Sequence, residues 1–78
     1  MLTGAQIFAA RKLLGWSVAD LSRAARVSPV AIQYAESADG TPNLHKGNRL
    51  AIRRALETAG VEFWFGADPD VRLREAVK

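Results

Sequence analysis

Three helix-start signatures fall within the first 32 residues, and they constrain the fold more than any other feature of the chain. In each signature a hydroxyl residue suited to the N-cap lies between an apolar residue and a second apolar residue in the helix that follows. The three caps are Thr3, Ser17 and Ser28. The apolar pairs around them are Leu2 with Ile7, Trp16 with Leu21, and Val27 with Ile32. The chain is therefore predicted to begin with three short helices in close succession.

Residues after each cap support these starts and mark the helix ends. Gln6 and Asp20 each follow a cap by three positions, as in a capping box, and Pro29 suits a first helical position. Gly15 and Gly60 suit left-handed helix ends. Helices are predicted for residues 4–14, 18–25, 29–37 and 44–59, with a loop over 38–43. The side chains predicted to face inward are Ile7, Ala10, Leu14, Leu21, Ala24, Ala25, Ile32, Ala35, Leu44, Ile52, Leu56 and Ala59.

The apolar pattern changes its period after Gly60. Apolar residues then alternate along residues 61–65 and again along 71–74, which predicts two short strands around a turn at 66–70. Because an isolated two-stranded hairpin is marginally stable in water, these strands must pack on the helices or pair with a second chain.

Composition and charge narrow the range of functions. The 78 residues are 49% hydrophobic, enough for one small domain with a core. The absence of cysteine excludes disulfides, a thiol nucleophile and cysteine-based zinc sites. Residues 1–60 hold eight Lys or Arg against four acids, whereas residues 61–78 hold three against four, so the basic excess favours a polyanionic partner for the first part. We find no targeting segment and no apolar run near the roughly 20 residues of a membrane helix, and we expect a cytoplasmic protein.

The second and third predicted helices are separated by only three residues, 26–28. This spacing is typical of a helix-turn-helix, in which the first helix braces on the DNA backbone and the second inserts its first turn into the major groove. The arrangement needs a small residue where the helices touch, and Ser22 is suitably placed. Arg26 occupies the turn, where a left-handed backbone would cost a non-glycine residue roughly 1–2 kcal/mol.

Residues 3–60 resemble the Cro/phage-repressor family of bacterial helix-turn-helix regulators. The resemblance rests on Ala10-Arg11, Leu14-Gly15-Trp16-Ser17, Asp20-Leu21, Ala24, Val27-Ser28, Ile32, Glu36-Ser37 and Gly40-Thr41-Pro42. It implies a mainly α, lambda-repressor-like bundle of four to five short helices over residues 1–60. Residues 61–78 would form a C-terminal β-hairpin extension, similar to one on short bacterial members of the family.

The resemblance also implies which residues would contact DNA. Base edges would be read by Ser28, Pro29, Val30, Gln33 and Tyr34. Phosphates would be contacted by Ser17, Val18, Arg23, Arg26, Thr41, Asn43 and Lys46. The chain departs from the family pattern at Val18, usually glutamine, and at Arg26, usually glycine. Only Gln33 in the base-reading set can bond bidentately to adenine, so apolar contacts and DNA shape would carry much of the specificity.

In the family an arginine of the first helix pairs with a glutamate at the end of the third. The matching residues are Arg11 and Glu36. The pair would fix the recognition helix; the alternative is a surface ion pair that contributes about 0–1 kcal/mol.

These observations predict a sequence-specific transcriptional regulator, most simply a repressor, that binds a palindromic operator as a homodimer. The predicted dimer residues are Val61, Phe63, Trp64, Phe65, Val71 and Leu73. The alternative is a helix-turn-helix-derived protein-interaction module that does not bind DNA, for which Pro29, Val30 and Tyr34 would suit as a docking surface. We expect no enzyme activity, because the single histidine, His45, has no nearby carboxylate pair or nucleophile. We also expect no cofactor, metal, membrane contact or small-molecule ligand.

Overall fold

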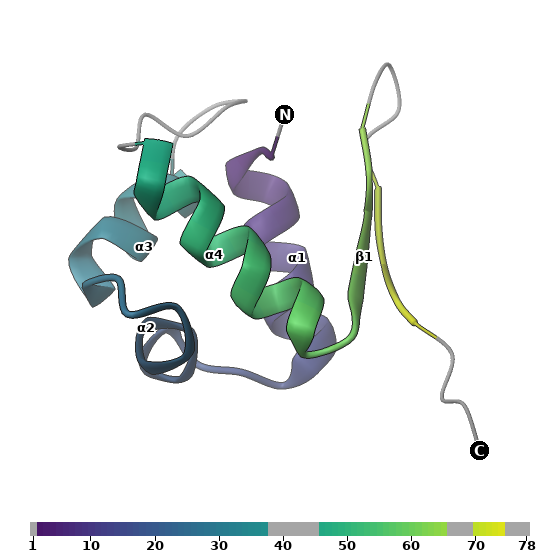
Figure 1. Ribbon diagram of the computed structural model, residues 1–78, viewed down its shortest axis with the longest axis horizontal. Helices are drawn as coiled ribbons and strands as arrows, with labels where there is room; N and C mark the ends of the chain where they lie inside the picture. Colours follow the sequence, from purple (N-terminus) through teal and green to yellow (C-terminus); the bar gives the residue numbers. More distant parts are fainter. Residues whose placement is uncertain (1, 38–45, 66–69, 75–78) are drawn as a thin grey trace.

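The computed structural model describes four helices and two strands within residues 2–37, 46–65 and 70–74 (Figure 1). The side chain of Lys46 lies outside this description. The elements are α1 (Gly4–Leu14), α2 (Val18–Ala25), α3 (Pro29–Ser37), α4 (Lys46–Thr58), β1 (Val61–Trp64) and β2 (Asp70–Leu73). Over this part of the chain, the mainly helical fold with a C-terminal hairpin that the sequence predicts is confirmed.

All three predicted N-caps form. The Thr3 hydroxyl accepts a hydrogen bond from the Gln6 backbone at 3.1 Å, and the Gln6 side chain accepts one from the Thr3 backbone at 3.0 Å. Ser17 and Asp20 make the same reciprocal pair at 3.1 and 2.9 Å. Ser28 Oγ accepts from the backbone of Ala31 at 3.2 Å. Local side-chain bonds therefore start the three N-terminal helices where the sequence predicted.

Residues with positive φ follow α1, α2 and α4. Gly15 has φ 69° and ψ 26°, and its N–H bonds back to α1. Gly60 has φ 109° and follows α4, which ends at Thr58, one residue before the predicted end. The predicted start of this helix at residues 44–45 lies outside the described residues. α4 is the longest helix with 13 residues, and no helix in the described ranges is both long and apolar enough to cross a membrane.

The core gathers apolar side chains from all four helices and from β1. Its members are Leu2, Ile7, Ala10, Leu21, Ala25, Val27, Ile32, Ala35, Ile52, Leu56 and Val61. Most of the predicted inward residues are among them, and Leu14 packs against them half-buried. The prediction for Ala24 is wrong, because this residue is exposed and lines a groove between α2 and α4. Leu44 lies outside the described residues.

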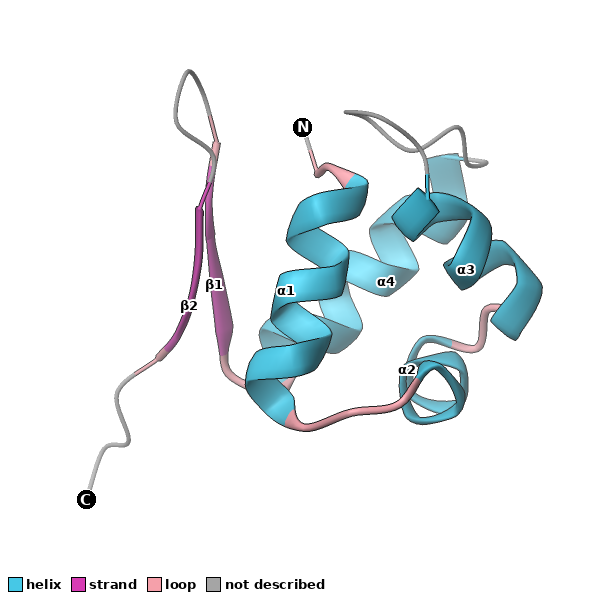
Figure 2. Ribbon diagram, turned by 180° about the vertical axis from the view of Figure 1, so that it is seen from behind, coloured by secondary structure: helices cyan, strands magenta, loops and turns pink. Residues whose placement is uncertain are grey.

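The two strands form an antiparallel hairpin within the chain (Figure 2). Val61 pairs with Leu73, and Phe63 pairs with Val71. The hairpin lies beside α1, and Val61 at its base is 1% exposed in the core. The strands are confirmed within one residue of their predicted ends. They pack on the helices, which is one of the two arrangements that the sequence left open.

Gln6 attaches the hairpin to α1. Its side-chain nitrogen donates to the carbonyl oxygens of Trp64 at 2.7 Å and Asp70 at 3.3 Å. The residue is 4% exposed, and its side-chain oxygen remains in the capping box. One buried amide thus begins α1 and also holds both strands of the hairpin.

Candidate nucleic-acid interface

The turn between α2 and α3 is held by backbone geometry and one hydroxyl. Arg26 has φ 57° and ψ 43°, in the left-handed region, and its N–H bonds to Ser22 O. The Val27 N–H bonds to the same carbonyl at 3.3 Å. The Ser22 hydroxyl donates to Val27 O at 2.6 Å. The sequence analysis placed Ser22 at the helix contact because of its small size. The hydrogen bond of its hydroxyl could not be predicted, because small size alone would allow alanine at this position equally well.

A buried ion pair fixes the far end of α3. Arg11 donates from Nε to Glu36 Oε2 and from Nη2 to Glu36 Oε1, both at 2.9 Å. Its Nη1 donates to Trp16 O at 3.0 Å, just before α2. The two side chains are 9% and 10% exposed, so the surface ion pair considered as an alternative is not what forms. The hydrogen bonds to Glu36 raise the pKa of the Arg11 guanidinium. A single guanidinium therefore joins α1, α3 and the entry to α2.

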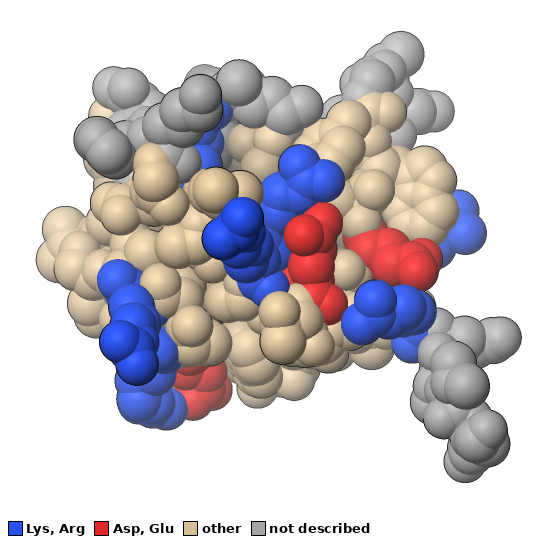
Figure 3. All heavy atoms as spheres, viewed as in Figure 1, with Lys and Arg blue, Asp and Glu red and all other residues tan. Residues whose placement is uncertain are grey.

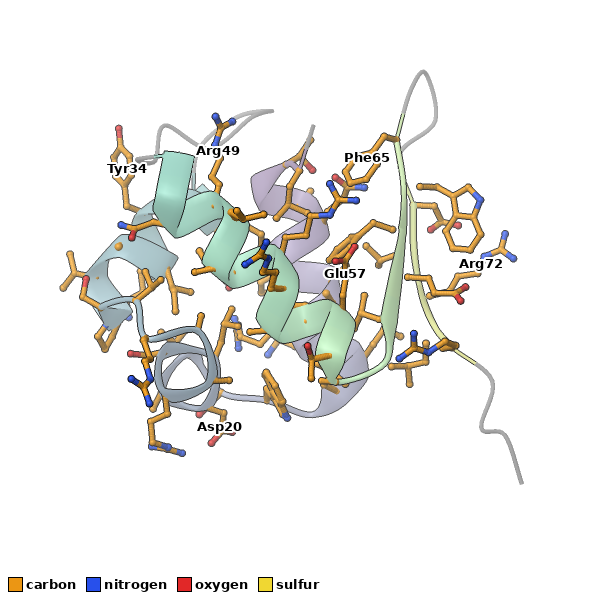
Figure 4. The ribbon with its side chains drawn as sticks, in the orientation of Figure 1. Asp20, Tyr34, Arg49, Glu57, Phe65 and Arg72 are labelled. Atoms are coloured by element: carbon orange, nitrogen blue, oxygen red, sulfur yellow. The ribbon has the colours of Figure 1, made fainter. Side chains whose placement is uncertain are left out.

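The outer face of α3 is exposed along its length. Ile32 and Ala35 are fully buried and orient the helix. Val30 is 73% exposed and Tyr34 is 51% exposed, and Tyr34 points away from the bundle (Figure 4). All five residues of the predicted base-reading set are exposed: Ser28, Pro29, Val30, Gln33 and Tyr34. The structure therefore brings this set together on one accessible surface, which we call the α3 face.

The first turn of α3 offers few donors to a ligand. Pro29 has no N–H, and the N–H groups of Ala31 and Ile32 are bonded to Ser28. Among the first-turn amides, only that of Val30 is left without a partner within the described residues. No charged side chain belongs to the α3 face, so its chemistry is apolar with one amide, one phenol and one hydroxyl.

The start of α2 carries its own anion. Asp20 accepts from the Ser17 backbone at 2.9 Å and from Arg23 at 2.6 Å. The hydrogen bond from the Ser17 backbone, the largest cause, lowers the pKa of the Asp20 carboxyl. Val18 packs half-buried against the core. A phosphate at this helix start would meet backbone N–H groups but also a neighbouring carboxylate.

Other predicted phosphate contacts lie elsewhere or outside the described residues. Thr41 and Asn43 fall in the undescribed segment, and the side chain of Lys46 is also outside the description. Arg26 lines the groove between α2 and α4 together with Arg54. The structure therefore does not place Arg26 within the α3 face.

The chain was compared with known proteins. No model of a protein family matches it, and a search of curated proteins also returned no match. The family resemblance therefore depends on the sequence motifs quoted above.

The hairpin presents two exposed apolar side chains, Trp64 at 42% and Leu73 at 47%. The Arg72 guanidinium lies 4.7 Å from the Trp64 ring centre and pairs with Asp70 at 3.6 Å. Figure 4 shows Arg72 on the side of the hairpin away from the helices. The other four predicted dimer residues, Val61, Phe63, Phe65 and Val71, belong to the core or pack against it. Leu73 pairs with Val61 and therefore lies on the face of the hairpin that meets the helices, whereas Trp64 pairs with Asp70 and lies on the opposite face. A contact with a second copy through the outer face of the hairpin would thus use Trp64.

Proposed function

We propose that the protein is a sequence-specific DNA-binding regulator with a lambda-repressor-like helix-turn-helix, in which α3 enters the major groove. The observation that carries the proposal is the exposed α3 face, held between the α2–α3 turn and the buried pair of Arg11 with Glu36. This is the part of a helix-turn-helix that must be exposed to read bases. The resemblance in sequence supports the same reading.

Base recognition on this surface would combine one polar reader with apolar contacts. Gln33 can bond bidentately to an adenine edge, and Val30 and Pro29 can contact thymine methyl groups. The Ser28 hydroxyl and the Tyr34 phenol add donors at the two ends of the face. A surface of this kind favours A·T-rich half-sites, with DNA shape adding to the specificity.

Selection of bound sequences from a random duplex pool tests the proposal. We expect one enriched motif whose affinity falls steeply with salt, by about 0.9 in log affinity per log salt for each neutralised phosphate. Gln33→Ala and Tyr34→Ala should each lose about 1–3 kcal/mol of sequence discrimination. Replacing Lys46 should weaken binding to all sequences alike. An absence of enriched sequences and of binding at low salt would contradict the proposal.

We also propose that the regulator binds as a homodimer, because one short helix reads few base pairs and a two-fold dimer doubles the contact. Trp64, on the outer face of the hairpin, would form the contact. Deleting residues 61–78 is a poor test because it removes Val61 from the core. Trp64→Glu should instead give a folded monomer in sedimentation, and an unchanged dimer would contradict this assignment.

Occupation of an operator represses by excluding other proteins from the same DNA, so repression in the bacterial cytoplasm is the regulatory outcome that we propose.

Two observations favour a second function, a protein-interaction module that does not bind DNA. The α3 face has no charged side chain, and Asp20 places a carboxylate at the start of α2. Both features suit docking of an apolar protein surface better than phosphate contact. A protein-interaction module would fail to bind DNA even at low salt, whereas the proposed regulator would bind.

A further inference from the structure

A groove runs between α2 and α4, apart from the α3 face. Alanines from both helices line it, and so does Trp16, which is half-buried. Arg26 and Arg54 also line it, and no acidic residue among those that the structure describes does. The groove is therefore concave, largely apolar and positively charged, a combination typical of sites that fix a ligand by a few polar groups around an apolar centre.

The two arginines of the groove differ from the others in their bonding. Arg11, Arg23, Arg53 and Arg72 each form an ion pair with a carboxylate. Arg74 donates to the carbonyl of Glu57 at 3.3 Å. Arg26 and Arg54 are exposed, and their side chains form no ion pair and no hydrogen bond with any described residue. Figure 3 shows basic side chains over α2 and over α4, with uncharged surface between them. The positive charges of Arg26 and Arg54 are therefore not paired with any described side chain of the protein.

Arg26 supplies a second, independent observation. It is the single non-glycine residue with positive φ among the described residues. A left-handed conformation costs a residue with a side chain roughly 1–2 kcal/mol, and such strain is concentrated at functional positions. A glycine would make the same turn without this strain, whereas Arg26 adds a charged side chain beside the groove.

We infer that the α2–α4 groove binds an acidic segment of a partner protein. An apolar side chain of the segment would contact the alanines that line the groove beside Trp16. Carboxylates on either side of it would pair with Arg26 and Arg54. Arginine forms planar, bidentate pairs with carboxylates, which fixes the register of such a segment. Because the groove shares no residue with the α3 face, the inference does not depend on the proposed function.

Random dodecapeptides displayed on phage and selected on the full chain provide the probe. We expect enriched sequences to carry acidic residues around one large apolar residue. A synthetic copy of an enriched peptide is then titrated into a Trp64→Phe variant, in which Trp16 is the only tryptophan. The peptide should change the emission of Trp16, because that ring lines the groove.

Adjacent arginines of α4 give a matched pair of variants. Arg54→Ala should weaken peptide binding about tenfold, the loss expected for an interfacial charge pair. Arg53→Ala should leave it within about twofold, because Arg53 already pairs with Glu57 at 2.9 Å and is absent from the groove. Ala24→Leu, at an exposed position in the groove, should block the peptide while circular dichroism shows an unchanged fold.

Three results would overturn the inference. The first is a selection that enriches no sequence, or only neutral or basic sequences. The second is an equal effect of Arg53→Ala and Arg54→Ala on peptide binding. The third is a loss of affinity for duplex DNA, rather than for the peptide, when Arg26 and Arg54 are replaced, which would assign these arginines to phosphate.

Discussion

Asp20 makes the stability of the start of α2 depend on pH. Its carboxylate accepts from the Ser17 backbone, which lowers its pKa in the folded chain. A lowered folded pKa contributes stability that is present above the unfolded pKa and is lost as the pH falls through the folded value. The capping box around Ser17 and Asp20 should therefore weaken on acidification.

We expect Asp20→Asn to be less stable than the wild type near neutral pH. The difference in unfolding free energy between the two should shrink as the pH falls from about 7 to about 2, because both side chains are then neutral. Urea unfolding at a series of pH values measures this difference. A difference that stays constant across the series would show that the Asp20 charge does not stabilise the helix start.

Single residues also show what local sequence can predict. The hydrogen bonds of Thr3, Ser17 and Ser28 were predictable because the cap hydroxyl and the backbone N–H that donates to it lie only three residues apart. The left-handed backbone at Arg26 could be anticipated from its place in the turn. The groove beside it could not, because it requires knowing which face of α4 lies against α2.

At the scale of elements, the bond between Arg11 and Glu36 determines how α3 lies on α1. The family resemblance predicted the pair, but its burial depends on packing between three elements and had no local signal. We expect Glu36→Ala to lower the unfolding free energy by about 3 kcal/mol, because it leaves a buried guanidinium unpaired. Denaturant unfolding of Glu36→Ala, of Arg11→Ala and of the double variant measures the coupling energy between the two side chains. If Glu36→Ala changes the stability by less than about 1 kcal/mol, the pair is not holding α3.

The attachment of the hairpin to α1 gives a second test at this scale. Gln6→Glu keeps the oxygen that caps α1 but replaces the nitrogen that donates to Trp64 and Asp70. We expect a loss of about 2 kcal/mol, because both hydrogen bonds are removed in a buried position. Amide exchange should accelerate in β2 before it does in α3. Uniform acceleration throughout the chain would indicate that Gln6 stabilises only the helix start.

The hairpin itself was partly predictable. Alternation after Gly60 predicted the two strands, whereas the position of Val61 in the core and of Phe63 against it was not predicted, since both were assigned to a dimer contact. Local sequence could not show whether the two strands pair with each other or with strands of a second chain. The backbone groups at a strand edge can form hydrogen bonds with either partner. The bonds from Gln6, 58 residues before Trp64, were also beyond any local pattern.

At the scale of the whole molecule, the α3 face and the hairpin lie at opposite ends. Figure 1 shows α3 at one end of the longest axis and the hairpin at the other, with α1 and α4 between them. The extents are 36 × 30 × 19 Å. A dimer formed through Trp64 would therefore leave the α3 face of each protomer uncovered. This arrangement is compatible with simultaneous dimerisation and DNA binding.

The central claim is that the α3 face meets DNA, and a matched pair of charge substitutions tests it most directly. Val30→Glu places a carboxylate on the α3 face, whereas Leu13→Glu makes the same charge change on α1 at a position that is 43% exposed. Both should fold, since neither residue is buried. The affinity of each variant for a labelled duplex is measured at two salt concentrations. The account predicts that Val30→Glu lowers the affinity at least about tenfold while Leu13→Glu stays near the wild type. Equal affinities of the two variants, or no binding by the wild type at low salt, would contradict it.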